Sequence, residues 1–352
     1  MIAFDEHKLD ALLVSSLPNV RYLTAFTGSN AMVLLTPESM TLITDPRYDI
    51  QAREESRQAL LPTRVAVSKK HLWETALQAV ERRKLKRVGF EASQLSFEQH
   101  KAMASQLPSG FALKPAGRLV EELRLVKTVE EVALIRRSVL TNSSAFEAVV
   151  QQIRPGITEN DVAAELDYQM RKRGAEGPAF ETIVASGART ALPHARPTLK
   201  TLNPNDLILI DVGACQDGYM SDMTRMLFLG KPDKKVRAMY AAVRDAQLAA
   251  IGAVREGAAT RKVDRAARSV LQGAGLDRAF VHSTGHGLGL EIHEAPRVGK
   301  KDKTKLKAGM VITIEPGAYV EGVGGMRIED TVLVTSAGCE VLTPTSKDLR
   351  LI

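Results

Sequence analysis

Four acidic residues stand inside or at the ends of apolar segments that are typical of buried strands. Asp211 ends the run LILID, and Glu315 ends the run VITIE. Asp222 lies within GYMSDMTRMLF, and Glu329 lies within MRIEDTVLV. A carboxylate in a buried strand is costly unless a charge or a metal ion compensates it. Each one alone could be an exposed strand end or a turn residue, but this explanation does not readily account for all four together.

A pair of metal ions would account for the four carboxylates together. Two divalent cations balance four carboxylate charges, and one neutral imidazole can complete the set. Oxygen-rich ligation favours hard ions such as Mn²⁺. A thiolate site is not indicated, because the two cysteines, Cys215 and Cys339, are isolated from each other in the sequence.

Histidines, which could supply the imidazole, are concentrated in the segment HSTGHGLGLEIHEAP at residues 282–296. It contains His282, His286 and His293, three of the seven histidines of the chain. The glycines between them allow the backbone to come close to an ion or a substrate. A lone histidine is more often structural than a ligand, and His194 is ambiguous for that reason. The clustering among glycines favours a functional role for the segment.

Strand alternation adds an arginine to this group. Side chains two residues apart share a face of a strand, so Arg327 and Glu329 are expected to point the same way. Arg327 is therefore predicted to orient the Glu329 carboxylate from beside the metal site. The alternative is a surface salt bridge.

The elements that must position these residues fall into two parts. The first ~120 residues read as an α/β unit, and a boundary is expected near residues 117–124. Long helices are expected beyond it, and Thr128 with Glu131 fits a capping box at the start of the first. The expected strands of the first part are residues 12–15, 32–36, 40–44 and 87–90, and the later helices are residues 158–173, 233–255 and 260–273.

Two strand pairs are expected to carry the acidic residues. Asp217-Gly218 is a turn signal between residues 207–213 and 218–229, which predicts a hairpin. Residues 310–315 and 326–335 form the second expected pair.

Length, charge and cysteine content exclude several classes of protein. A chain of 352 residues is expected to form two domains. The net charge of +7 could indicate nucleic-acid binding, but the basic runs at residues 81–87 and 300–307 contain no interleaved aromatics, so a solvated basic surface is favoured. Two cysteines, a charged N-terminus and short apolar runs predict a soluble cytoplasmic protein with no membrane or nucleic-acid partner.

Together the segments resemble the proline-specific metallopeptidases of the pita-bread fold, which include aminopeptidase P and prolidase (Xaa-Pro dipeptidase). The motifs are Asp211 with Asp222, GHGLGLEIHEAP, ITIEPGAY and GGMRIEDTV. The resemblance implies an α/β (α+β) architecture, with a pita-bread catalytic domain at residues 122–352. Residues 1–121, including DPRYDIQA, resemble the creatinase-like N-terminal domain of these enzymes with a weaker signal.

The resemblance also implies a role for each candidate residue. Asp211 would chelate one ion, Asp222 and Glu329 would bridge two ions, and His286 would ligate the second. Glu315 would ligate that ion and act as general base. The remaining implied roles belong to His194 and His293, which would hold substrate and stabilise the tetrahedral intermediate, and to Arg327, which would brace the site. Met223 and Met226 depart from the expected residues in the second strand, but neither is a ligand.

Substrate choice within the family rests on Arg297, which follows the histidine-rich segment. It could bind the free carboxylate of a C-terminal proline, or it could be an exposed loop arginine. With the short N-terminal domain, it favours Xaa-Pro dipeptidase over aminopeptidase P. Methionine aminopeptidase usually lacks such an N-terminal domain.

Two alternatives lie outside metal-dependent catalysis. Non-catalytic pita-bread binding modules have lost their metal ligands, and creatinase works without metal. The intact set of five ligands opposes both. The family further implies small proline-containing peptides as substrates, a homodimer, and Mn²⁺ as the favoured ion, with Co²⁺ and Zn²⁺ as alternatives.

Overall fold

The computed structural model describes residues 2–352. These residues form two compact units. The first unit ends at Arg124 and the second begins at Leu125. The predicted boundary between residues 121 and 122 lies inside helix α5 (Leu119–Arg124), just before this division.

A six-stranded mixed sheet forms the centre of the first unit, with the strand order β4-β3-β2-β1-β5-β6. Its elements are β1 (Ala11–Val14), α1 (Leu17–Thr24), β2 (Ala31–Leu35), β3 (Met40–Thr44), η1 (Pro46–Tyr48), α2 (Asp49–Glu55), η2 (Ser56–Gln58), β4 (Thr63–Val67), α3 (Leu72–Arg82), β5 (Arg87–Glu91), α4 (Phe97–Gln106), β6 (Ala112–Ala116) and α5. The strands predicted from apolar runs are present within one residue of their expected starts.

Strand β1 shows why these runs are continuously apolar rather than alternating. Leu12 and Val14 pack into one core cluster with residues of α1, α2 and α5. Ala11 and Leu13 pack into another with residues of α3 and α4. Helices therefore cover both faces of the sheet, and a strand between two helix layers has no solvent-facing side.

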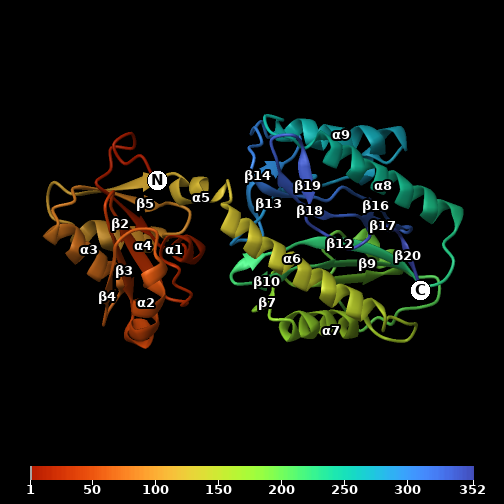
Figure 1. The fold of residues 1–352 in the computed structure, drawn as a ribbon, viewed down its shortest axis with the longest axis horizontal. Helices are drawn as coiled ribbons and strands as arrows, with labels where there is room; N and C mark the ends of the chain where they lie inside the picture. The colour runs from red at the N-terminus through yellow and green to blue at the C-terminus, as the bar shows by residue number, and fades with distance from the viewer. Residues whose placement is uncertain (1) are drawn as a thin grey trace. The chain divides into compact units, whose positions relative to one another are not determined.

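The second unit contains two larger sheets and two pairs of long helices (Figure 1). Its helices are α6 (Val129–Val150), α7 (Glu159–Lys172), η3 (Gly187–Ala191), α8 (Lys234–Ala253), α9 (Thr260–Gly273) and η4 (Asp277–Ala279). Its strands are β7 (Gly177–Pro178), β8 (Ile183–Ser186), β9 (Leu207–Val212), β10 (Ala214–Gln216), β11 (Tyr219–Met220), β12 (Met223–Phe228), β13 (Gly285–Gly287), β14 (Glu294–Val298), β15 (Val311–Ile314), β16 (Gly317–Val320), β17 (Gly324–Arg327), β18 (Asp330–Val334), β19 (Cys339–Val341) and β20 (Arg350–Leu351).

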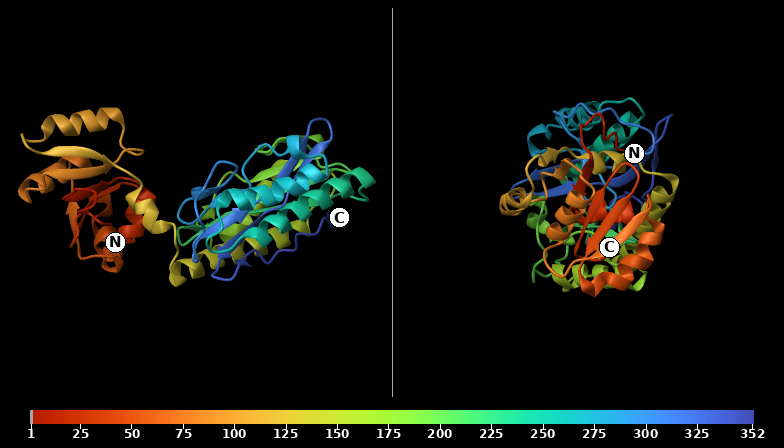
Figure 2. Two further views of the ribbon diagram at one scale, coloured as in Figure 1. Left: turned by 90° about the horizontal axis from the view of Figure 1, so that it is seen from above. Right: turned by 90° about the vertical axis from the view of Figure 1, so that its left-hand side faces the viewer.

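The helices lie on opposite sides of the strands. Helices α6 and α7 pack on β8, β9 and β12 through one core cluster. Helices α8 and α9 pack on the other side, against β9 and β12 and against the sheet that contains β15 and β18. Figure 2 shows α8 and α9, drawn in teal, lying over the strands of this unit. The strands that carry the candidate residues are thus enclosed between two helix layers.

Local sequence signals explain where the helices begin. Thr128 and Glu131 form the predicted capping box of α6. Thr158 and Asp161 form a capping box at the start of α7. In each box two backbone N–H groups at the helix start gain side-chain acceptors.

The predicted hairpin is also present. Strands β9 and β12 pair antiparallel, with Asp211 opposite Thr224. Asp217 and Gly218 both have positive φ, 53° and 79°, which is the backbone of a tight hairpin turn. Strands β15 and β18 form the second expected pair, and Ile314 lies opposite Asp330. Within residues 2–352, no helix combines the length and apolar character that crossing a bilayer requires.

Candidate functional site

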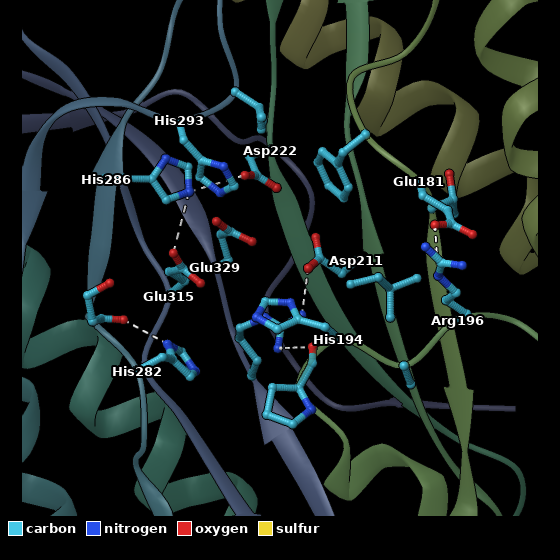
Figure 3. Close-up of a pocket in the computed structure, with 18 of the residues that line it drawn as sticks. Glu181, His194, Arg196, Asp211, Asp222, His282, His286, His293, Glu315 and Glu329 are labelled. Atoms are coloured by element: carbon cyan, nitrogen blue, oxygen red, sulfur yellow. Dashed lines mark hydrogen bonds and ion pairs between the residues drawn. The ribbon is translucent and has the colours of Figure 1, made fainter. Parts of the chain in front are cut away.

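A pocket of about 720 Å³ in the second unit gathers every candidate residue singled out from the sequence. The residues that line it include the nine candidates His194, Asp211, Asp222, His286, His293, Arg297, Glu315, Arg327 and Glu329. Figure 3 shows the four carboxylates in the space between His286 and His293 on one side and His194 on the other. Residues more than 100 positions apart in the chain therefore face one cavity.

The centre of the pocket has the composition of a metal site. Asp222, His286 and Glu329 each present a ligand atom within 4.8 Å of the others. The Nε2 atom of His286 lies 3.6 Å from Asp222 Oδ2 and 3.5 Å from Glu315 Oε1. Its other ring nitrogen, Nδ1, lies 3.0 Å from the carbonyl oxygen of Gly287. Because a carbonyl only accepts, Nδ1 donates, and Nε2 is left with the lone pair that a cation needs.

Three of the four acidic residues flank strands rather than lying within them. Asp211 belongs to β9, but Asp222 precedes β12, Glu315 follows β15, and Glu329 lies between β17 and β18. Their backbones are still held by hydrogen bonds. The N–H of Glu315 donates to Thr284 O at 2.7 Å, and the N–H of Glu329 donates to Thr224 O at 3.2 Å. Hydrogen bonds at the strand ends thus hold these carboxylate-bearing residues in place, although three of the four lie outside the strands.

The acidic cluster is electrostatically unfavourable without a counter-charge. Burial raises the pKa of Glu315 to about 7. Burial, together with neighbouring carboxylates, raises the pKa of Asp222 and of Glu329 well above the usual range. Each of these groups therefore resists ionisation in this environment.

Two oxygen atoms of the cluster also lack partners. Among the described residues, Asp211 Oδ1 and Glu329 Oε1 are buried without a hydrogen bond. Hard divalent cations fit this donor set, because they would give these oxygens a partner and neutralise the carboxylates.

Arg327 contacts the carboxylate cluster through hydrogen bonds. Its NH2 atom donates to Asp211 Oδ2 at 2.5 Å, and its Nε atom donates to Thr224 Oγ1 at 3.0 Å. Thr224 in turn donates to Glu329 Oε2 at 2.8 Å. Arg327 is thus linked directly to one carboxylate and through a hydroxyl to another. The alternative of a surface salt bridge is excluded, since the Arg327 side chain is only 3% exposed.

Exposed nitrogen-bearing side chains also line the pocket, on both sides of the carboxylates. His194, His293 and Arg297 are all solvent-exposed and line the pocket. The ring of His293 makes an edge-on contact with the ring of His286, with centroids 4.5 Å apart. These side chains and the carboxylates therefore line the same cavity.

Sequence reasoning gave no role to two further side chains near the pocket, His282 and Tyr319. The Tyr319 hydroxyl accepts from Arg327 NH1 at 2.5 Å and lies 3.0 Å from His282 Nε2. Burial lowers the pKa of His282 to about 4 and raises the pKa of Tyr319 to about 12, which keeps both neutral. No local pattern marked Tyr319, whose position depends on the pairing of β16 with β17: Gly317 lies opposite Arg327 and Tyr319 is two residues further along.

An ion pair at the mouth of the pocket was also not anticipated. Glu181 and Arg196 approach to 3.2 Å, and both side chains are largely exposed (Figure 3). Exposed pairs of this kind contribute little to stability.

Comparison with known proteins agrees with this geometry. Residues 133–336 match the pattern of metallopeptidase family M24, and residues 3–126 match the creatinase/prolidase N-terminal domain. The Xaa-Pro dipeptidase of Pyrococcus horikoshii is 36% identical over 98% of this chain and 95% of its own length.

Two solved structures extend the similarity to three dimensions. The Xaa-Pro dipeptidase from Bacillus anthracis has a TM-score of 0.95 at 36% identity, and the alignment covers 99% of this chain and 97% of that one. The X-Pro aminopeptidase from Thermotoga maritima has a TM-score of 0.91 at 34% identity, covering 98% of each chain. The predicted mixed α/β fold is therefore confirmed. This chain belongs to metallopeptidase family M24 and carries a creatinase/prolidase N-terminal domain.

Proposed function

We propose that this protein hydrolyses Xaa-Pro dipeptides, using two divalent cations held by Asp211, Asp222, His286, Glu315 and Glu329. The observation that carries the proposal is that one pocket holds both a cluster of four carboxylates and the exposed side chains of His194, His293 and Arg297. The similarity to Xaa-Pro dipeptidases along nearly the whole chain supports the same substrate class.

Manganese is the proposed ion, because four of the five ligands are carboxylates and only one is an imidazole. Bound cations would lower the pKa of water and polarise the scissile carbonyl, as in other two-metal hydrolases. Cobalt and zinc remain the alternatives for the same ligands.

The protein's own side chains would then perform the proton and charge steps. Glu315 would take a proton from the attacking water and deliver it to the proline nitrogen as the bond breaks. His194 and His293 would donate hydrogen bonds to the carbonyl oxygen as negative charge develops there. Arg327 would hold Asp211 in place throughout, through the 2.5 Å contact described above.

Arg297 would select substrates by their length. Its side chain is exposed and lines the pocket, and it belongs to β14, the strand that comes directly after His293. A guanidinium is well matched to a carboxylate, and a dipeptide carries a free carboxylate on the proline itself. The second candidate function is Xaa-Pro aminopeptidase, which the similarity to the Thermotoga maritima structure favours.

The test is a hydrolysis assay on protein treated with EDTA and then supplied with Mn²⁺. Activity on an Xaa-Pro dipeptide should disappear with EDTA and return with Mn²⁺. Arg297→Met should raise KM for the dipeptide by about tenfold or more, the effect of losing ~1.5–3 kcal/mol from a charged hydrogen bond, with a smaller change in kcat. Equal turnover with and without EDTA would refute the metal mechanism, and faster cleavage of tripeptides than dipeptides would favour the aminopeptidase.

A further inference from the structure

His194 reaches the pocket from a loop rather than from a strand or a long helix. This loop, residues 187–197, is called the His194 loop below. It follows β8, begins with the short helix η3 and continues in turns. His194 itself is exposed and lines the pocket. The position of an exposed side chain on a loop depends on how the loop is anchored to more rigid elements.

The carboxylate of Glu159 joins the two ends of the His194 loop. Ser186, directly before the loop, donates to Glu159 Oε1 from its N–H at 2.9 Å and from its hydroxyl at 2.8 Å. Thr198, directly after the loop, donates to Glu159 Oε2 from its N–H at 3.1 Å and from its hydroxyl at 2.8 Å. Each oxygen of one fully buried carboxylate therefore holds one end of the loop.

An arginine inside the loop extends this anchor towards the histidine. The Nε atom of Arg189 donates to Glu159 Oε2 at 3.2 Å, and its NH2 atom donates to the carbonyl oxygen of Arg196 at 2.7 Å. On the other side of the histidine, Arg327 NH1 donates to the carbonyl oxygen of Pro193 at 3.2 Å. The backbone on both sides of the histidine is thus held, on one side through Arg189 and Glu159.

The position of Glu159 at the start of α7 makes this anchor rigid and suited to a negative charge. The N–H of Glu159 donates to the carbonyl oxygen of Lys200 at 3.0 Å, which ties the helix start to the segment after the loop. A carboxylate at a helix N-terminus is stabilised by the helix dipole. Every group that meets the carboxylate is a donor, and a carboxylate only accepts. An amide at this position would turn an NH2 group towards donors at one end of the loop.

We infer that Glu159 is a positioning residue for His194. The inference rests on the proposed function, in which His194 donates a hydrogen bond to the carbonyl oxygen as negative charge develops there. Glu159 is not among the described residues that line the pocket, so it acts through the loop alone. By closing the base of the loop, it keeps the imidazole within reach of that oxygen. A displacement of about 1 Å from a change far from the chemistry can cost about 100-fold in rate.

The experiment compares Glu159→Gln with Asp161→Asn, the same acid-to-amide change two residues along the same helix. Asp161 is exposed and accepts from the N–H of Thr158 at 2.8 Å, so it belongs to the helix cap and not to the loop. With Mn²⁺ present, kcat for Ala-Pro should fall about ten- to 100-fold in Glu159→Gln. Its Mn²⁺ affinity should be kept, because the proposed ligands lie on other segments. Asp161→Asn should keep both kcat and Mn²⁺ affinity.

A double-mutant cycle separates positioning of His194 from a general weakening of the fold. In a His194→Ala background, Glu159→Gln should cause little further loss of kcat, because the side chain that it positions is already gone. Equal losses in the two backgrounds would overturn the inference and leave the proposed function standing. Thr198→Val, which removes one donor from one end of the loop, is the milder variant if Glu159→Gln does not fold. Its kcat should fall as well, and an unchanged kcat would count against the inference.

Hydrogen exchange of the metal-free protein tests the anchor without any turnover. Backbone amides of residues 186–198 should exchange faster in Glu159→Gln than in the parent chain, and at the parent rate in Asp161→Asn. Faster exchange confined to Glu159→Gln would support the anchor even if no peptide is cleaved, in which case the proposed function alone fails. Exchange at the parent rate in Glu159→Gln would overturn the inference.

Discussion

At the scale of single residues, the site consists of charges that are unfavourable alone and favourable together with cations. Asp222 is the most informative residue, because it lies beside His286 and its pKa is raised by burial and by Glu329. Removing a ligand of this kind should affect metal binding strongly and folding weakly.

Asp222→Ala is therefore expected to lose Mn²⁺ and activity while remaining folded. Activity should fall at least ~100-fold, the upper range for losing even an outer partner of a metal ligand. Without metal, the variant should unfold at the same temperature as the parent chain or higher, since one repelling carboxylate is gone. Metal content, peptide hydrolysis and circular dichroism measure the three effects. Asp277→Ala, a change at an exposed acidic residue on η4, is the control, and full turnover by Asp222→Ala would contradict the ligand assignment.

At the scale of elements, the start of α6 is tied to the histidine-rich loop by a buried ion pair. Lys127 Nζ lies 3.0 Å from Glu294 Oε2, and the two side chains are 2% and 7% exposed. Glu294 follows His293 and also accepts from the N–H of Glu291 at 3.2 Å. The pair thus anchors the segment that presents His293 to the pocket.

Lys127→Met should destabilise the second unit by about 3–5 kcal/mol, because it leaves a buried carboxylate without its cation. Lys127→Met/Glu294→Gln should recover part of this loss. Arg136→Ala removes a partly exposed pair between α6 and β19 and should cost no more than ~1 kcal/mol. Urea unfolding of the three variants makes the comparison, and similar losses for Lys127→Met and Arg136→Ala would show that the buried pair has no special role.

Strand β13 depends on a glycine at the point where it meets β15. A Cβ atom at Gly285 would lie 1.9 Å from the carbonyl oxygen of Thr313. Gly285→Ala must therefore push the two strands apart next to His286.

Gly285→Ala is expected to lower both stability and metal affinity, with a stability loss of at least ~1–3 kcal/mol from overpacking. Gly273→Ala in α9 meets open space and should be neutral or stabilising by up to ~1 kcal/mol. Thermal unfolding and Mn²⁺ titration of both variants provide the readout. Wild-type metal affinity in Gly285→Ala would mean that the strand contact does not position His286.

The sequence was most informative where a few neighbouring residues form an unusual or characteristic pattern. Acidic residues such as Asp211 and Glu315 are rare enough in apolar runs to be recognised one by one, and capping boxes such as that of Thr128 mark helix starts locally. Tyr319 gave no such signal, because a tyrosine in a short strand is ordinary core material. The pairing of Lys127 with Glu294 depends on contacts between residues 167 positions apart, which no local pattern contains.

At the scale of the whole molecule, the two units have separate hydrophobic cores, and all proposed metal ligands belong to the second. Units of this size commonly fold as independent domains. Cation binding should therefore act on one unit and leave the other unchanged.

Calorimetry should show this division as a Mn²⁺-dependent shift of one unfolding transition. At Mn²⁺ one hundred times its Kd, the free energy of unfolding of the second unit should rise by about 2.7 kcal/mol. Asp222→Ala should show no shift under the same conditions. A metal-induced shift of equal size in both transitions would contradict the independence of the two units.

The buried oxygens Asp211 Oδ1 and Glu329 Oε1 have a consequence for the life of the protein in a cell. If the proposed manganese site is correct, a chain made during manganese shortage would keep an uncompensated acidic cluster at its centre, so it would open more often and present more sites to cellular proteases. We expect its abundance to follow the supply of the ion even at constant synthesis. The proposed metal site would then determine the lifetime of the protein in the cell as well as its activity.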